Sequence, residues 1–190
     1  MAKPELPQNL KRLSEILGNS HPMMPGNEIV PQFLAELKLE EVGELFSQVF
    51  SLFRETVDRE HEVALRKHHF VQNVYLDKEA RQLSEIAEAL ASWMEGNGIE
   101  FILAVRAQAV ESLMNRHQTS RKNIDRYSSS NSHYRRFHIG SLPHDTAEGH
   151  TALRLGFSAD TNGVLLYTWS TGAIANFDIR DVYLTNICYP

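Results

Sequence analysis

The stretch YRRFHIGSLPHDTAEGH, residues 134–150, gathers side chains that can transfer protons and neutralise phosphates. It holds three histidines, two arginines, a tyrosine, an aspartate and a glutamate. Histidine can act as a general acid or base near neutral pH, and arginine can stabilise the negative charge that develops on a phosphate. The segment therefore predicts, as one alternative, a metal-independent ribonuclease toxin that uses Tyr134, Arg135, Arg136, His138, His144 and His150.

The histidines of this region are spaced poorly for a metal. His133, His138, His144 and His150 are five, six and six residues apart, and only the first pair matches a common zinc spacing. The single cysteine, Cys188, provides no cysteine pair that would complete such a site. We therefore predict no metal and no other cofactor.

A second group of residues favours binding over catalysis. Residues 106–136 carry seven arginine and lysine side chains against two acidic ones, in a chain whose net charge is -5. Arginine and tyrosine are enriched where proteins contact partners. The sequence therefore predicts a binding surface made of Arg116, Arg121, Lys122, Arg126, Tyr127, Tyr134, Arg135 and Arg136.

This basic segment leads to the main functional prediction. We expect a non-enzymatic regulatory or inhibitory interaction protein that docks on a larger protein or nucleoprotein assembly through residues 106–136 and the adjoining loop. Direct nucleic-acid binding is a further alternative, because arginines can hold phosphates while tyrosines stack on bases. The negative net charge weighs against that alternative, because nucleic-acid domains tend to be basic overall.

Composition and missing motifs exclude several other classes. The chain is 42% hydrophobic and 23% charged, which is typical of a globular protein. It lacks a signal-peptide-like apolar run and any stretch of about 18 apolar residues, so we expect a cytoplasmic protein without a membrane partner. Glycine-rich phosphate loops and a G-x-S-x-G nucleophile elbow are also missing, which removes support for nucleotide-dependent and serine-hydrolase classes.

The first two thirds of the sequence has helical patterning. Prolines and glycines at 18–31 predict that residues 1–26 form one short helix and an irregular arm. Apolar residues recur at spacings of three and four over 39–75, 80–94 and 101–114, and EGNG at 95–98 is expected to end the second stripe. These stripes predict an antiparallel helical bundle over 27–118, and the long first stripe also predicts a possible homodimer.

The last third changes character. Residues 119–133 are polar and serine-rich, which predicts a basic connector that is mobile or extended. Residues 134–190 contain alternating runs, and Asn162-Gly163 within DTNG favours the positive backbone angles of a hairpin turn. The predicted fold class is α+β, with an N-terminal antiparallel helical bundle followed by a small C-terminal antiparallel β-sheet packed on it.

Overall fold

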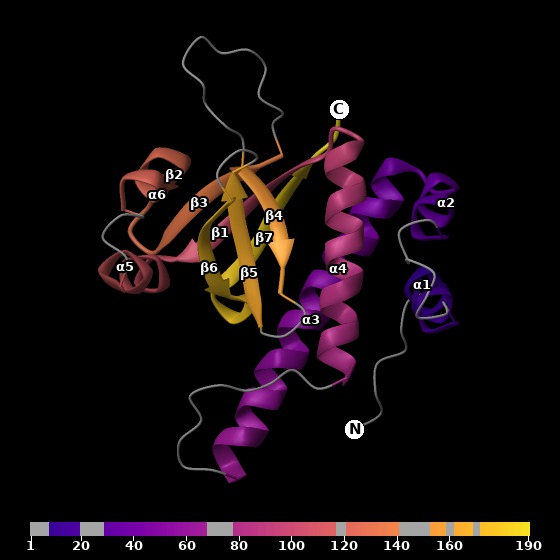
Figure 1. Ribbon diagram of the computed structural model, residues 1–190, viewed down its shortest axis with the longest axis horizontal. Coiled ribbons are helices and arrows are strands. Elements are labelled where there is room, and N and C mark those ends of the chain that lie inside the picture. Colours follow the sequence, from indigo (N-terminus) through magenta and orange to yellow (C-terminus); the bar gives the residue numbers. More distant parts are fainter. Residues whose placement is uncertain are drawn as a thin grey trace.

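The computed structural model describes residues 8–19, 29–67, 78–116, 121–140, 153–158, 162–168 and 172–190. These ranges contain the α-helices α1 (Gln8–Asn19), α2 (Ile29–Ala35), α3 (Leu39–Lys67), α4 (Lys78–Gly96), α5 (Ala107–Arg116) and α6 (Arg121–Tyr127), and the 3-10 helix η1 (Ile179–Asp181). They also contain the strands β1 (Glu100–Arg106), β2 (Ser128–Ser130), β3 (Tyr134–Ile139), β4 (Leu153–Phe157), β5 (Gly163–Thr168), β6 (Gly172–Asp178) and β7 (Val182–Cys188). The predicted α+β class is confirmed (Figure 1).

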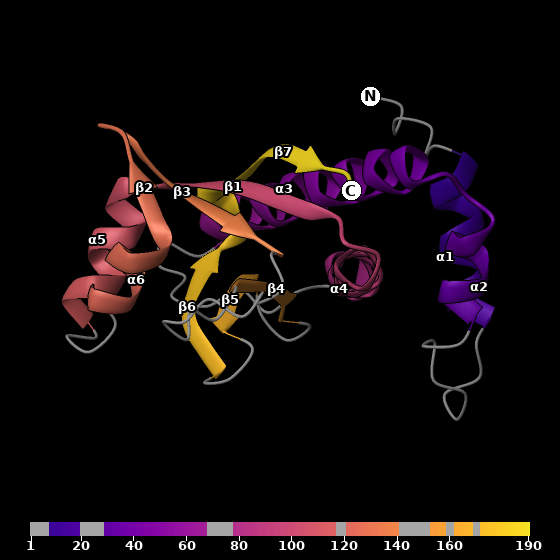
Figure 2. The ribbon, with the colours of Figure 1, turned by 90° about the horizontal axis from the view of Figure 1, so that it is seen from above.

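The described strands form two antiparallel sheets. The larger sheet has the order β2-β3-β1-β7, and the smaller one has the order β4-β5-β6. Strand β1 is central, because it pairs with β3 on one side and with β7 on the other. Figure 2 shows the smaller sheet on one side of the larger sheet, with α5 and α6 near β2, and with α1 and α2 at the opposite end of the molecule.

One core joins the helices to both sheets. The apolar stripe of α3 is buried from Val42 to Val57. The Phe46 ring of this stripe lies with its centroid 5.0 Å from that of Phe101 in β1 and 6.4 Å from that of Phe157 in β4. Burial of these large side chains is the main favourable contribution to folding, so α3 holds the two sheets together.

The third helical stripe is a correction to the sequence analysis. Residues 101–114 were expected to form a helix, but Glu100–Arg106 is strand β1 and only Ala107–Arg116 is helical. The sequence FILAV is apolar at five consecutive positions, and such a run suits a strand buried on both faces as well as it suits a helix. The expected three-helix antiparallel bundle over 27–118 is therefore wrong in this form, because the element after α4 enters the sheet.

The predicted end of the second stripe is confirmed. Gly98 has a φ of 74°, which is a left-handed conformation that glycine adopts without the strain of a Cβ atom. The Ile99 amide donates to the Met94 carbonyl at 2.9 Å, and the Gly98 amide donates to the Glu95 carbonyl at 3.1 Å. This pair of bonds is a Schellman motif, which ends α4 and directs the chain into β1.

The predictions for the other helical regions are confirmed where residues are described. The short helix expected within 1–26 is α1, and the long helix expected over 39–75 is present over Leu39–Lys67. Residues 20–28 and 68–77 lie outside the described ranges. The apolar stripe of α3 packs inside its own chain through Val57. The homodimer through this helix remains a prediction.

The connector and the hairpin each differ in part from expectation. Within the predicted connector over 119–133, residues 121–127 form α6 and residues 128–130 form β2, which pairs with β3. The hairpin is confirmed, since β4 and β5 are antiparallel with Phe157 opposite Val164. Neither Asn162 nor Gly163 has the positive φ that we expected there, and residues 159–161 of the same connection lie outside the described ranges.

Candidate functional site: a pocket and an arginine–tyrosine cluster

A pocket of about 560 Å³ lies between α3 and the segment that joins η1 to β7. Residues three and four positions apart share a helix face, and one such face of α3 forms the first wall: Ser47, Phe50, Ser51, Arg54, Glu55 and Asp58. The second wall is formed by residues 180–184 together with Arg106 at the end of β1. Three arginines and three carboxylates line the pocket, so their formal charges balance.

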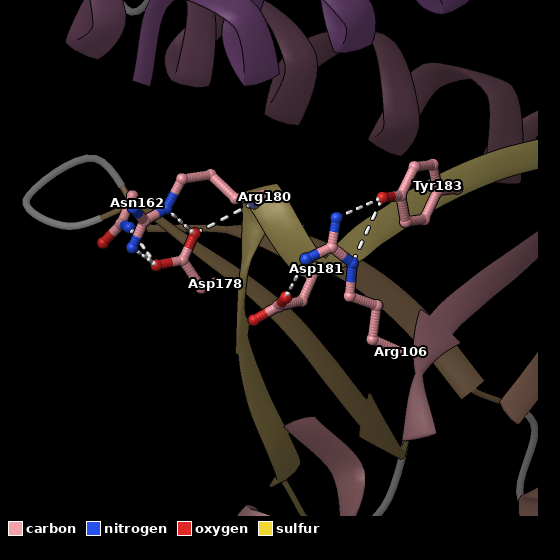
Figure 3. A network of polar contacts seen from close by, with 6 residues as sticks. All are labelled: Arg106, Asn162, Asp178, Arg180, Asp181 and Tyr183. Atoms are coloured by element: carbon pink, nitrogen blue, oxygen red, sulfur yellow. Dashed lines mark hydrogen bonds and ion pairs between the residues drawn. The ribbon is translucent and has the colours of Figure 1, made fainter. Parts of the chain in front are cut away.

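Three of these lining residues and a tyrosine of β3 form what we call the Arg–Tyr cluster, made of Arg54, Arg106, Tyr134 and Tyr183. The guanidinium of Arg54 lies 3.8 Å from the ring centre of Tyr183, a cation–π contact. The rings of Tyr134 and Tyr183 meet edge to face, with centroids 5.6 Å apart and planes at 85°. Arg106 donates to the Tyr183 hydroxyl from Nη2 at 2.8 Å and from Nε at 3.2 Å (Figure 3).

The sheet register brings the cluster together. Tyr134 lies opposite Arg106 across the β1–β3 pair, and Tyr183 lies opposite Ala104 across the β1–β7 pair. Alternate residues of a strand share one face, so Arg106 and Ala104 place both tyrosines on the same side of the sheet. We call this side, which points away from β4–β6, the open face; Arg136 and His138 of β3 lie on it and are exposed.

The charge of Arg106 is fixed by its surroundings. The Tyr183 hydroxyl, which accepts hydrogen bonds from the guanidinium, raises the pKa of Arg106, and Asp181 contributes in the same direction. Oδ1 of Asp181 lies 3.6 Å from Nη1 of Arg106. Burial raises the pKa of Asp181 and the neighbouring Asp178 raises it further, while the nearby arginines oppose both.

Arg180 is held by a carboxylate of its own. Its Nε donates to Oδ1 of Asp178 at 3.0 Å and its Nη2 donates to Oδ2 at 2.7 Å, a two-pronged arginine–carboxylate pair (Figure 3). The Asp178 carboxylate also accepts from the Arg180 amide at 2.9 Å and from Nδ2 of Asn162 at 2.6 Å. These bonds raise the pKa of Arg180 and fix η1 at the end of the pocket.

A second group of charged residues joins α4 to the edge strand β4, and we call it the α4–β4 seam. Glu95 is 4% exposed, and its carboxylate accepts from the Leu155 amide at 2.9 Å and from Nε of Arg154 at 3.1 Å. Two and three turns earlier on α4, Glu88 accepts from the Phe157 amide at 2.6 Å, and the Ser84 hydroxyl donates to the Ser158 carbonyl at 3.1 Å. Burial raises the pKa of both glutamates.

The residues of the ribonuclease alternative are only partly described. Tyr134, Arg136 and His138 lie on the open face, whereas Arg135 lies on the other side of β3 and pairs with Asp125 at 3.5 Å. Nε2 of His138 lies 2.6 Å from Oε2 of Glu100. His144 and His150 lie outside the described residues, so convergence of the histidines on one phosphate remains a prediction.

The residues of the predicted binding surface fall on separate elements. Arg116 is exposed at the end of α5, while Arg121 and Lys122 are the first residues of α6. Arg126 lies over the Tyr127 ring at 5.9 Å, within the same helix. Tyr134 and Arg136 are the members of the predicted set that lie on the open face.

The sequence analysis missed the centre of the site. Arg54 occupies a polar position beside the apolar stripe of α3, where a charged residue is ordinary and does not indicate a site. Tyr183 lies in an alternating run that predicted only a strand. Arg106 was counted in the basic segment but was not selected as a site residue. Residues 54, 106 and 183 are far apart in the chain, and no spacing rule connects them.

Comparisons of this chain with protein-family models, with curated proteins and with solved structures each found no match. Within the described ranges, no three histidine, cysteine, aspartate or glutamate side chains are grouped as a metal ion would require. The helices of the same ranges include none with the length and apolar character needed to cross a membrane. The functional argument therefore depends on the geometry of the pocket, the Arg–Tyr cluster and the open face.

Proposed function

We propose that this protein acts by binding, as a non-enzymatic regulatory or inhibitory protein that docks on a larger protein or nucleoprotein assembly. The proposed contact surface is the open face, with the Arg–Tyr cluster at the end of the face where β1 ends and β3 and β7 begin. This surface overlaps the basic segment 106–136 through Arg106, Tyr134 and Arg136, and it adds Tyr183 from β7.

The observation that carries the proposal is the mutual support of the four cluster side chains. Each aromatic ring is held in place by a neighbour: Arg54 covers Tyr183, and Tyr134 meets Tyr183 at its edge. Tyrosine and arginine dominate binding energy at interfaces, and side chains already held in position lose less conformational entropy on binding. A fixed cluster of these residue types at a protein surface is therefore well suited to anchor a partner.

The charge of the open face favours an acidic partner surface. Arg136 is exposed, and it follows Tyr134 by two positions on the same face of β3. Arg135 is paired with Asp125, and Arg106 is paired with Asp181. Because these carboxylates offset their charge, Arg135 and Arg106 attract an acidic partner less than Arg136 does. Arg136 is thus the cation of this face whose reversal is expected to affect docking most.

The test is affinity capture from the native lysate with the tagged chain, with and without nuclease treatment. Arg136→Glu is expected to reduce the retained partner at least 10-fold in both halves, while the far-UV circular dichroism stays unchanged. Arg81→Glu, a charge reversal at an exposed position of α4 outside the basic segment, is the matched control and is expected to retain the partner. Equal capture by the wild type and Arg136→Glu would overturn the proposal, and a partner lost on nuclease treatment would favour the nucleic-acid alternative.

A further inference from the structure

The pocket between α3 and β7 contains one arginine that differs from the other two. Arg180 is bound by Asp178 through two hydrogen bonds, and Arg106 is bound by Tyr183 and Asp181. Arg54 contacts the ring of Tyr183, and no hydrogen-bond acceptor or ion-pair partner for it is found among the described residues. Its guanidinium is therefore fixed in position while its N–H donors are available.

We propose that this pocket binds a small molecule that carries a phosphate or carboxylate group, and that the guanidinium of Arg54 holds that group. A planar guanidinium presents its donors as a fork that matches two oxygens of a carboxylate or phosphate. The ring of Tyr183 supports one face of the guanidinium, which leaves the edge that carries the donors free for such a contact.

The size and the lining of the pocket fit this class of ligand. A volume of about 560 Å³ lies within the range of roughly 300 to 1,000 Å³ that small-molecule sites have. Glu55 and Asp58 follow Arg54 on the same face of α3, and their carboxylates can accept hydrogen bonds from hydroxyl or amine groups of the ligand. Phe50, one turn before Arg54, offers an apolar surface for the remainder of the ligand.

The pairing of charges around the pocket makes recognition local. Asp178 neutralises Arg180 and Asp181 pairs with Arg106, so Arg54 faces the carboxylates of Glu55 and Asp58, and the pocket has no positive field that would attract every anion. Asp181 is paired with Arg106 at 3.6 Å, which limits its repulsion of an anion at Arg54. Specificity is thus expected to come from the geometry of the Arg54 fork, and the site goes beyond partner docking on the open face.

The experiment is an NMR titration of the full chain with matched probes. Inorganic phosphate and glycerol 3-phosphate test the phosphate source, and acetate and glycerate test the carboxylate source. In the arm that matches the ligand, amide shifts are expected in residues 51–58 and 180–184, which form the two walls. The isolated chain is used throughout, so the result does not depend on whether a macromolecular partner exists.

Three variants decide whether Arg54 is responsible. Arg54→Ala is expected to weaken binding about 10- to 100-fold, and Arg54→Lys is expected to weaken it less, because lysine keeps the charge but lacks the fork. Arg59→Ala is the matched control, since Arg59 is exposed on α3 and pairs with Glu79 at 3.6 Å. Absence of shifts in both arms, or equal binding by the wild type and Arg54→Ala, would overturn the proposal.

Discussion

Two helices of this protein each run beside an edge strand, and they use charged side chains in opposite ways. Along β4, the glutamates of α4 accept hydrogen bonds from strand amides. Along β7, α3 is in less extensive contact with the strand than α4 is with β4, and its charged residues line a pocket. Carboxylates that accept from backbone amides are satisfied within the fold, whereas charged side chains that face a cavity remain available for a ligand.

The largest effect is expected at the α4–β4 seam. Glu95→Ala would leave the buried Leu155 amide without its acceptor and would remove one partner of Arg154. Hydrogen bonds to a charged group contribute about 1.5 to 3 kcal/mol each, and Arg154 is exposed enough to turn towards solvent, so the free energy of unfolding is expected to fall by about 3 kcal/mol. Urea denaturation followed by circular dichroism measures the change.

Glu85→Ala is the control for that substitution, because Glu85 lies on α4 and is exposed. Its effect is expected to stay within about 0.5 kcal/mol, as for most surface substitutions. A loss below about 1 kcal/mol for Glu95→Ala would show that the seam contributes little to stability and would remove the contrast with the α3–β7 side.

The contrast also explains what the sequence could and could not predict. Helices α3 and α4 and the β4–β5 hairpin were predictable, because apolar periodicity and turn residues act over a few positions. Strand β1 was not, since its five consecutive apolar residues have no period that separates a strand from a helix. Its position in the sheet depends on pairing with β3 and β7, which come much later in the chain.

The candidate site was predictable only in part, for the same reason. Tyr134 and Arg136 were selected by local density, and their shared face followed from the alternation of a strand. Arg54 and Tyr183 meet through tertiary packing between α3 and β7, over a separation that local patterns do not report. The density of histidine and arginine over 134–150 thus pointed to part of the surface but away from the pocket.

A pair of glycine substitutions sharpens the comparison at an intermediate size of effect. In Gly156→Ala, the new Cβ would lie 2.7 Å from Cε1 of Tyr167, whose ring packs beneath Arg154 on β4. Overpacking of this kind costs about 1 to 3 kcal/mol, because a half-buried ring has to move. The free energy of unfolding from urea denaturation is the measurement.

Gly43→Ala is the counterpart on the α3–β7 side. Its Cβ would overlap the Tyr189 hydroxyl, but Tyr189 is 40% exposed and can move outward. Alanine is also favoured over glycine inside a helix by about 1 kcal/mol, so the net change is expected to stay within about 1 kcal/mol. Equal losses for the two variants would mean that both junctions are packed with the same tightness, contrary to the comparison.

The smallest effect is a change in how stability depends on pH. Burial raises the pKa of Glu88 and Glu95 in the folded chain above the ordinary value of 4.5. The folded chain therefore retains protons that the unfolded chain releases, and the stability that this provides is complete below pH 4.5. That stability is lost as the pH rises through the folded-state pKa values.

Glu88→Gln tests this dependence, because glutamine keeps an oxygen that can accept from the Phe157 amide but carries no titrating proton. The variant also removes the negative charge that raises the pKa of Glu95. The difference in the free energy of unfolding, variant minus wild type, is therefore expected to increase as the pH rises above 4.5. Urea denaturation at steps from about pH 4 to pH 8 measures this difference.

Glu85→Gln is the control for the loss of one negative charge from α4. A difference that stays constant or decreases with pH would mean that ionised Glu88 does not destabilise the seam, and that its bond to the strand outweighs the cost of burial.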